Sequence, residues 1–228
     1  MATDIFLIGN FPENTVLIIG AGRFGGRAAR ILGPSLKSPL WLLDVNREAL
    51  ARVDAPAVSK VRDDGIRFLA ENMALLKPTN VIVPSIPRHL AFEWVKACIG
   101  RPGATPIPVP QEIQSLFPHA WMSPEGSLLV SYANFLCPED CEEPETHCTV
   151  TGEPRGVPLY ERLTRLEVKG YRMHIIRSRQ LAPGVGGYPV SDLNALMGRL
   201  RSLPGEKWLI GTACRCHGTV SALSVQVS

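Results

Sequence analysis

The chain has 228 residues, of which 45% are hydrophobic and 20% are charged, and its formal net charge at pH 7 is +3. This composition supplies enough apolar side chains for one large core or two small ones, and it excludes wholesale disorder. Because the positive charge is small and no long run of Lys or Arg occurs, nucleic acid and anionic membranes are not expected as partners.

The first fifteen residues, MATDIFLIGNFPENT, lack the basic and apolar regions of a signal peptide. No apolar stretch of the sequence approaches the roughly 20 residues needed to cross a bilayer. We therefore expect a cytoplasmic protein without membrane contact, in a reducing compartment that does not favour stable disulfides.

A glycine-rich turn follows the first predicted strand, VLII. Gly20, Gly22 and Gly25 have the G-x-G-x-x-G spacing, and Arg23 and Phe24 lie between the last two of them. In this fingerprint the glycines allow a tight turn, close approach of the backbone to a pyrophosphate, and close packing of helix on strand. The helix that begins there offers free N–H groups to phosphate. We predict that these five residues bind a dinucleotide.

The next predicted strand, LWLLD, ends in Asp44. A carboxylate at this position accepts hydrogen bonds from the ribose hydroxyls of NAD and repels the 2′-phosphate of NADP. Arg47 lies close by in the sequence and leaves NADP open as a cofactor. Other interpretations of the glycine turn are a role in packing only, an FAD or ATP/ADP site, and an S-adenosylmethionine site. The last usually carries an acid inside the first strand, where this chain is apolar.

Further helices and strands alternate along the first half of the chain, in NREALARV, AVSKVRDDGIRFLAENMALL, NVIVPSIP and HLAFEWVKACI. Strands that alternate with helices predict an α/β fold with a doubly wound, parallel, Rossmann-like sheet. We expect residues 1–122 to form this dinucleotide-binding domain. Residues 123–228 are expected to form a smaller α/β or α+β region that is rich in cysteine.

Residues 14–85, with the segments VLIIGAGRFGGRAARIL and LWLLDVNREALARV, resemble the nucleotide-binding domain of the RCK (TrkA-N) family. Members of that family regulate potassium channels and transporters. The resemblance implies a Rossmann-type fold with nucleotide contacts at Gly20, Gly22, Gly25 and Asp44. It carries no potassium role, because the family's second, ligand-sensing domain has no match here and the cysteine-rich region is foreign to the family.

The loop PSIPRH follows a predicted buried strand. In an open parallel sheet, ligands bind beyond the carboxyl ends of the strands, so Ser85 and His89 are candidate catalytic residues that face the nicotinamide or a substrate. Arg88 belongs to the same loop. The alternative is a proline-stiffened connection in which His89 only begins a helix.

Five of the six cysteines fall in two short segments. FLCPEDCEEPETHC contains Cys137, Cys141 and Cys148, and CRCH contains Cys214 and Cys216. Thiolates gather in this way around a metal, although the C-x3-C-x6-C spacing matches neither a bacterial ferredoxin nor a zinc ribbon. We predict that the first three cysteines and one or both of the last two bind a single metal centre. An iron–sulfur cluster is the first choice; structural zinc, metal-free reactive thiols and inert cysteines are the alternatives.

Three further features of the sequence bear on this site. His217 ranks behind Cys214 and Cys216, because in an extended segment it points to the opposite face. Cys98 lies on an apolar helix and is expected in the core. Five acidic side chains surround the first three cysteines, and they either lower the reduction potential of a cluster or form a solvated loop. They are Glu139, Asp140, Glu142, Glu143 and Glu145.

Residues 177–193 are predicted to contain the end of a strand, a glycine-rich loop and the start of a helix whose N-cap is Ser191. Such a loop, with Gly184, Gly186 and Gly187, is typical of an anion site or a mobile lid. A plain flexible loop is the alternative.

The sequence thus predicts an NAD(P)-dependent redox protein. Hydride or electrons would pass between a nicotinamide cofactor and a cysteine-ligated cluster or a substrate, with a small molecule or a redox protein as partner. The alternative is a non-catalytic module that senses NAD(H) or another nucleotide and holds structural zinc. The sequence leaves the substrate, the direction of reaction and the oligomeric state open.

Overall fold

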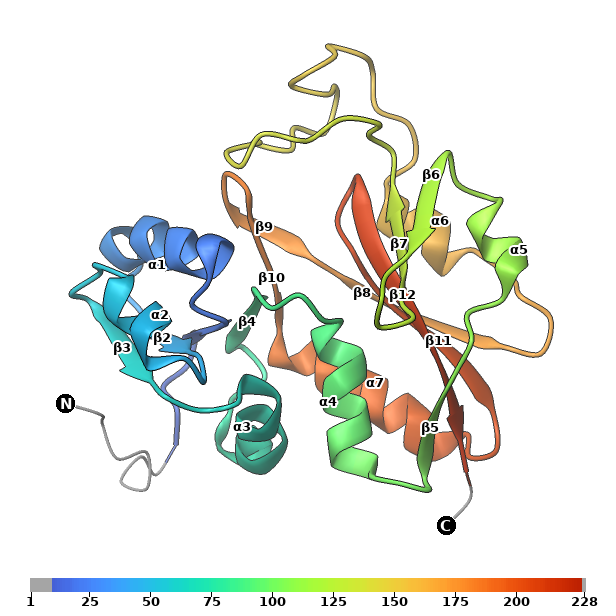
Figure 1. The fold of residues 1–228 in the computed structure, drawn as a ribbon, viewed down its shortest axis with the longest axis horizontal. Helices are drawn as coiled ribbons and strands as arrows, with labels where there is room; N and C mark the ends of the chain where they lie inside the picture. The colour runs from blue at the N-terminus through green and yellow to red at the C-terminus, as the bar shows by residue number, and fades with distance from the viewer. Residues whose placement is uncertain (1–9, 227–228) are drawn as a thin grey trace.

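The computed structural model describes residues 10–226, so the N-terminal stretch that lacks signal-peptide features lies largely outside the described residues. These residues form a mixed α/β fold with two six-stranded sheets (Figure 1). The first sheet has the order β3-β2-β1-β4-β10-β9. Its strands are β1 (Val16–Ile19), β2 (Leu40–Leu43), β3 (Val58–Val61), β4 (Val81–Pro84), β9 (Arg179–Ala182) and β10 (Val185–Pro189).

The second sheet has the order β6-β7-β12-β11-β8, and β5 pairs with the C-terminal part of β12. Its strands are β5 (Ala104–Ile107), β6 (His119–Met122), β7 (Leu128–Ser131), β8 (Arg172–Arg177), β11 (Lys207–Ala213) and β12 (His217–Val225). Its pairs are antiparallel except for that between β8 and β11.

The first four strands of the first sheet are parallel. Every residue of β1 and β2 is buried, as expected for parallel strands that are covered on both faces. The mixed α/β fold and the parallel pairing that the sequence predicts are therefore confirmed.

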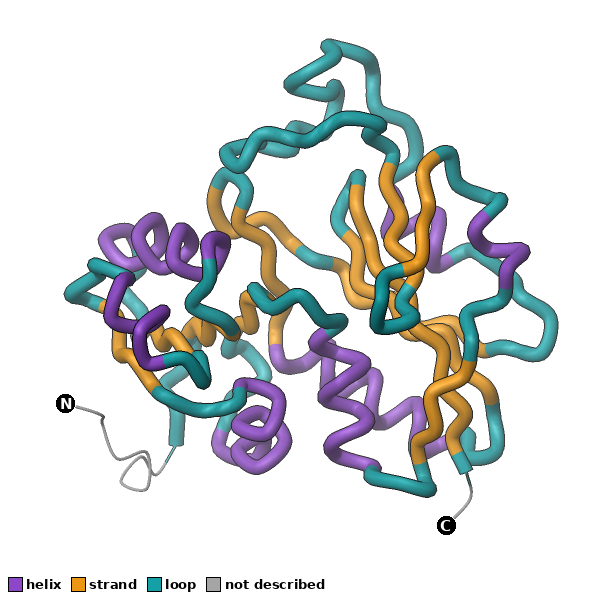
Figure 2. Tube along the Cα trace, viewed as in Figure 1, coloured by secondary structure: helices purple, strands orange, loops and turns teal. Residues whose placement is uncertain are grey.

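Helices cover both faces of the first sheet (Figure 2). The helices of the chain are α1 (Arg23–Ser35), α2 (Arg47–Arg52), α3 (Gly65–Asn72), the short 3-10 helix η2 (Met73–Leu75), α4 (Leu90–Ile99), α5 (Gln111–Gln114), α6 (Leu159–Thr164) and α7 (Val190–Ser202). Ile18 and Leu42 point to the face that packs on α1 and α2. Leu17 and Leu43 point to the other face, toward α3 and α4.

Helices α4 and α7 lie between the two sheets (Figure 1). Trp94 of α4 and Leu196 of α7 share one buried core with Trp208 and Leu223 of the second sheet. The two sheets are therefore joined by a continuous apolar layer, whose burial contributes about 25 cal/mol for each Å² removed from water. Helices α5 and α6 cover the far face of the second sheet.

The two sheets do not divide the chain at residue 122. Strand β5 precedes that position, yet it pairs with β12 in the second sheet. Strand β10 follows it, yet it pairs antiparallel with β4 in the first sheet. The chain thus crosses between the sheets in both directions.

The segment expected as a glycine-rich loop is instead the hairpin of β9 and β10. Gly186 and Gly187 are strand residues, and α7 begins at Val190, so Ser191 lies inside the helix. A Cβ atom at Gly187 would come within 2.8 Å of the carbonyl oxygen of Ile82. This glycine therefore serves the close approach of two strands, and the predicted lid is wrong.

Within residues 10–226, no helix combines the length and the apolar character that crossing a membrane requires.

Candidate functional site

A cavity of about 1590 Å³ lies where several distant parts of the chain meet. Arg23 and Phe24 at the start of α1, together with Pro84 at the end of β4, form one wall. The long loop between β7 and α6, at the top of Figure 2, the turn between β11 and β12, the β9–β10 hairpin and β6 form the others. The cavity thus adjoins the predicted dinucleotide turn.

The glycine turn has the geometry that its spacing predicts. Gly20 has φ +106°, a region that favours glycine, and a Cβ at Gly25 would lie 1.7 Å from the carbonyl oxygen of Gly20. Gly22 differs, because no atom lies within 4 Å of the place where its Cβ would be. The first and third glycines are therefore required by the turn, whereas Gly22 borders the open space where the fingerprint places a pyrophosphate.

Asp44 lies beside the glycine turn at the end of β2. Its Oδ2 accepts a hydrogen bond from the Ala21 N–H at 2.6 Å, and its Oδ1 accepts one from the Asn46 N–H at 2.7 Å. Each carboxylate oxygen retains a second lone pair that can accept a hydroxyl. Arg47 is exposed at the first position of α2.

The two candidate catalytic residues of the β4–α4 loop have different environments. Ser85 lies against the glycine turn. The N–H of Ser85 donates to the Ile19 carbonyl at 2.8 Å, and a Cβ at Gly25 would lie 3.1 Å from the Cβ of Ser85. His89 is buried instead, with Nδ1 2.8 Å from Ser221 Oγ and Nε2 3.1 Å from Thr212 Oγ1. His89 therefore does not face the cavity, because its ring joins the loop to the second sheet.

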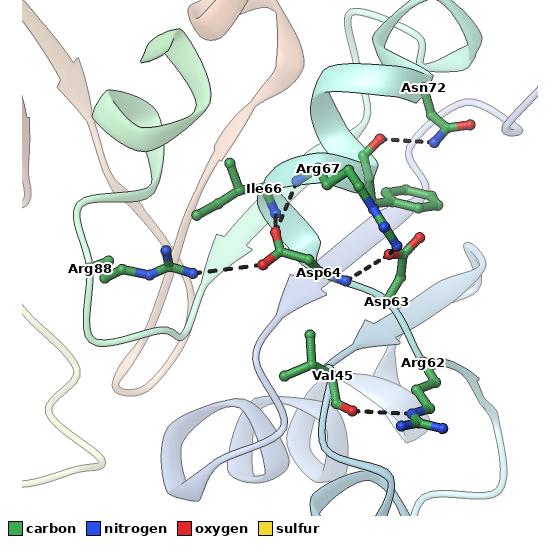
Figure 3. A network of polar contacts seen from close by, with 9 residues as sticks. Val45, Arg62, Asp63, Asp64, Ile66, Arg67, Asn72 and Arg88 are labelled. Carbon is green, nitrogen blue, oxygen red and sulfur yellow. Dashed lines mark hydrogen bonds and ion pairs between the residues drawn. The ribbon is translucent and has the colours of Figure 1, made fainter. Parts of the chain in front are cut away.

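Arg88 of the same loop is part of a polar network around the start of α3 (Figure 3). Its guanidinium lies 3.9 Å from a carboxylate oxygen of Asp64. The other oxygen of Asp64 accepts hydrogen bonds from the N–H groups of Ile66 and Arg67 and so caps the helix. Arg88 thus ties the loop to α3.

Burial lowers the pKa of His89 from its ordinary 6.5 to about 3. Because the ring binds a proton more readily in the unfolded chain, its contribution to stability is full above pH 6.5 and falls as the pH drops toward 3. We expect protonation of His89 in the unfolded chain to lower the free energy of unfolding by about 2–3 kcal/mol when the pH falls from 7 to 4.5. Urea unfolding at both pH values, for the wild type and for His89→Gln, measures the difference.

Between pH 7 and pH 4.5 the free energy of unfolding of His89→Gln should fall by about 2–3 kcal/mol less than that of the wild type. His174, whose pKa burial lowers to about 4, titrates in both proteins, so the comparison isolates His89. Equal losses in the two proteins would show that the ring is not held neutral in the fold.

All five clustered cysteines line the cavity. We define residues 133–157 as the cysteine loop. Its first part is docked on the β9–β10 hairpin and on the start of α1. The Cys141 carbonyl accepts hydrogen bonds from the Gly184 N–H at 2.9 Å and from Gln180 Nε2 at 2.7 Å. Glu139 forms an ion pair with Arg23 at 2.5 Å. The loop is thus held against both the β9–β10 hairpin and the start of α1.

The next part of the cysteine loop is docked on the turn between β11 and β12. Glu143 Oε1 accepts a hydrogen bond from the Arg215 N–H at 2.7 Å, and Glu145 forms an ion pair with the Arg215 guanidinium. Glu139 and Glu143 therefore hold the loop in place, whereas Glu145 keeps 81% of its side chain exposed and fits the description of a solvated acidic loop.

The segment CRCH is a tight turn rather than an extended segment. The N–H of Cys214 donates to the carbonyl of His217 at 2.9 Å, so the chain reverses between them. As a result, His217 Nε2 lies 3.5 Å from Cys137 Sγ, and His217 Nδ1 lies 3.9 Å from Cys214 Sγ. The ranking of His217 behind Cys214 and Cys216 rests on an extended segment, and the structure has a turn there instead. The polar segment RCHG between two apolar segments is the sequence signal of such a turn. Which of these side chains binds a metal stays a prediction.

The thiols have different electrostatic environments. Burial raises the pKa of Cys137, and the thiols of Cys141, Cys216 and Cys148 raise it further. Burial raises the pKa of Cys214 to about 12. A metal ion that binds these thiols must therefore displace their protons.

Two of the thiols have specific partners. The N–H groups of Thr151 and Val150 donate to the Cys148 sulfur and lower its pKa. Burial raises the pKa of Cys216, whereas the Arg155 guanidinium, which donates to its sulfur, opposes that effect. Cationic and N–H donors near sulfur favour the thiolate form.

The cysteines that line the cavity are candidate metal ligands, but they do not form a coordination shell. Among residues 10–226, no three Cys, His, Asp or Glu side chains are gathered closely enough to hold a metal ion. The binding of Cys137, Cys141, Cys148 and one or both of Cys214 and Cys216 to one metal therefore stays a prediction, while the presence of all five around one cavity is a feature of the fold. Cys98 lies elsewhere, on α4, where it packs against the core between the sheets.

The chain is similar to other proteins over most of its length. Residues 91–226 match the AF_1314_C family, which is described as "Uncharacterized protein, C-terminal domain". A protein from Archaeoglobus fulgidus, named "Uncharacterized protein", is 29% identical over 219 residues, which cover 91% of this chain and 98% of that protein. The family match begins inside α4 and includes all five cavity cysteines, and this chain therefore belongs to the AF_1314_C family.

Proposed function

We propose that the protein is an NAD(H)-dependent redox protein whose dinucleotide binds at Gly20–Gly25 and reaches into the cysteine-lined cavity. One observation carries the proposal: the start of α1 and all five clustered cysteines line the same cavity. A dinucleotide bound at the turn would thus have its reactive end near the thiols.

The topology of the first sheet supports a doubly wound, Rossmann-like domain of the kind seen in the RCK family. In the order β3-β2-β1-β4, the direction of winding reverses between β1 and β4. Ligands of open α/β sheets bind outside the carboxyl ends of the strands at such a switch point. Gly20 follows β1 and Ser85 follows β4, so the predicted site lies at this position.

The donor set around the cavity supports an iron–sulfur cluster, because four cysteine thiolates are what such a cluster requires and five cysteines are present. A cluster would supply one-electron transfer to complement the two-electron chemistry of a nicotinamide. The reaction class is the interconversion of NADH with NAD+ and a proton, in which the two electrons pass to or from a small molecule or redox protein. The glycine turn and Asp44 would orient the dinucleotide, and the cysteine loop would exclude water.

The nucleotide preference tests the first part of the proposal. NADH should bind at least roughly tenfold more tightly than NADPH, because Asp44 would repel the 2′-phosphate. Isothermal titration calorimetry with each nucleotide under reducing conditions measures both affinities. Absence of binding by either nucleotide would contradict the assignment, and a preference for NADPH would transfer the selecting role to Arg47.

A second function is a nucleotide sensor with structural zinc. His217 Nε2 beside Cys137 Sγ favours it, because mixed imidazole and thiolate ligands are typical of structural zinc sites. Anaerobic purification followed by metal analysis and a visible spectrum separates the two functions. Iron with a broad visible absorption supports the redox protein, whereas colourless protein with one zinc per chain supports the sensor.

A further inference from the structure

The contact between His217 and Cys137 has the dimensions of one edge of a metal site. In a tetrahedral site, metal–sulfur and metal–nitrogen bonds of about 2.3 and 2.0–2.1 Å place the two ligand atoms roughly 3.5 Å apart. Cys137 Sγ and His217 Nε2 are separated by 3.5 Å. These two atoms are therefore already at the spacing that adjacent ligands of one metal ion adopt.

The second nitrogen of His217 has a partner that holds the ring in this orientation. Its Nδ1 lies 3.9 Å from the sulfur of Cys214, which also accepts the N–H of Cys216 at 3.5 Å. Histidine ligands of metals commonly use the second nitrogen for such an orienting contact. Cys214 is thus engaged by the turn itself, while Cys216 is the other thiol of this turn that lines the cavity.

We propose that His217, through Nε2, is a ligand of the metal centre next to Cys137, with Cys216 and thiols of the cysteine loop completing the site, and that Cys214 is a positioning residue. This inference rests on the metal-centre part of the proposed function. It replaces an all-cysteine site by a mixed sulfur and nitrogen site, a donor set that suits zinc or an iron of a cluster.

The test is titration of the metal-free protein with Zn²⁺ and with Co²⁺ under anaerobic, reducing conditions. We expect His217→Ala to weaken binding by more than the roughly 100-fold that loss of a supporting hydrogen bond can cost. Cys214→Ala should weaken binding less, by roughly 10- to 100-fold. His119→Ala is the matched control, because His119 also lines the cavity and faces the same residue of β7, Ser131, from the opposite side.

A substitution that restores a ligand distinguishes coordination from a role in folding. His217→Cys should regain most of the affinity, and its Co²⁺ complex should show stronger sulfur-to-cobalt charge-transfer absorption than the wild type, because one more thiolate binds. Wild-type affinity in His217→Ala, an unchanged Co²⁺ spectrum in His217→Cys, or a larger loss in His119→Ala would each overturn the assignment of His217.

Failure of the wild type to bind Zn²⁺, Co²⁺ or iron would overturn the metal centre together with this inference. NADH binding is measured separately, so that result would leave the nucleotide site standing. Conversely, a metal-binding protein with no affinity for NADH would retain the His217 site and lose the redox function.

Discussion

Gly22→Leu is expected to abolish NADH binding while the protein remains folded. The space around the Gly22 Cβ position is open, and Gly22 has φ −67°, which any residue adopts. A leucine there would occupy the volume that a pyrophosphate needs, and we expect affinity to fall at least roughly 100-fold, or about 2.7 kcal/mol. The cost to stability should be about 1 kcal/mol, since Gly22 is the N-cap of α1.

Gly198→Leu is the matched control for this substitution. Gly198 is an exposed glycine of α7 with no atom within 4 Å of its Cβ position, so the same side chain is introduced far from the site. Calorimetric titration with NADH and thermal unfolding measured for both variants separate binding from folding. If Gly22→Leu retains wild-type affinity, the dinucleotide does not cross this turn.

Gly184→Ala is expected to release the cysteine loop from the β9–β10 hairpin. Gly184 has φ +69°, and a Cβ there would lie 1.6 Å from the carbonyl oxygen of Glu139. The loop must therefore move away, breaking the hydrogen bond from the Gly184 N–H to the Cys141 carbonyl. We expect two rates to rise at least roughly tenfold: proteolytic cleavage within residues 137–148, and reaction of the cavity thiols with a thiol reagent. A tenfold change corresponds to about 1.4 kcal/mol of lost docking free energy.

Gly170→Ala provides the comparison for backbone strain. Gly170 has φ +78° but no atom within 4 Å of its Cβ position. Alanine there must adopt the left-handed conformation, which costs about 1–2 kcal/mol, but it meets no steric clash. The cavity thiols of Gly170→Ala should therefore react at the wild-type rate. Equal thiol reactivity in Gly184→Ala and in the wild type would mean that the hairpin tip does not hold the loop.

The local elements of the first half could be predicted because their signals lie within short windows. A strand, three spaced glycines and a helix specify a compact turn, and burial of every residue of β1 accounts for its uninterrupted apolar sequence. Asp44 was predictable for the same reason, since its position at the end of β2 follows from the strand itself. The approximate places of β8, β11 and β12 also follow from their apolar character.

The partners of these elements were less predictable, because pairing depends on contacts that are distant in sequence. Nothing near Tyr188 indicates that β10 joins β4, and glycines that serve close strand packing look like loop glycines. His89 has the sequence environment of a helix start, but only the fold shows that Ser221 and Thr212 enclose its ring. The side of the chain that His217 faces was not predictable either, because a turn in place of an extended segment changes which side chains share a face.

The return of β10 to the first sheet has a consequence for how such a chain can change over evolution. The segment that matches the family includes β9, β10 and α7, so its own sequence carries the two strands that extend the first sheet beyond β4. Recombination between residues 85 and 185 would give β4 a foreign neighbour and leave backbone groups unpaired. The parallel strands of the first sheet and the thiol-bearing segment therefore form one inheritable unit, in which each part constrains the substitutions that the other can accept.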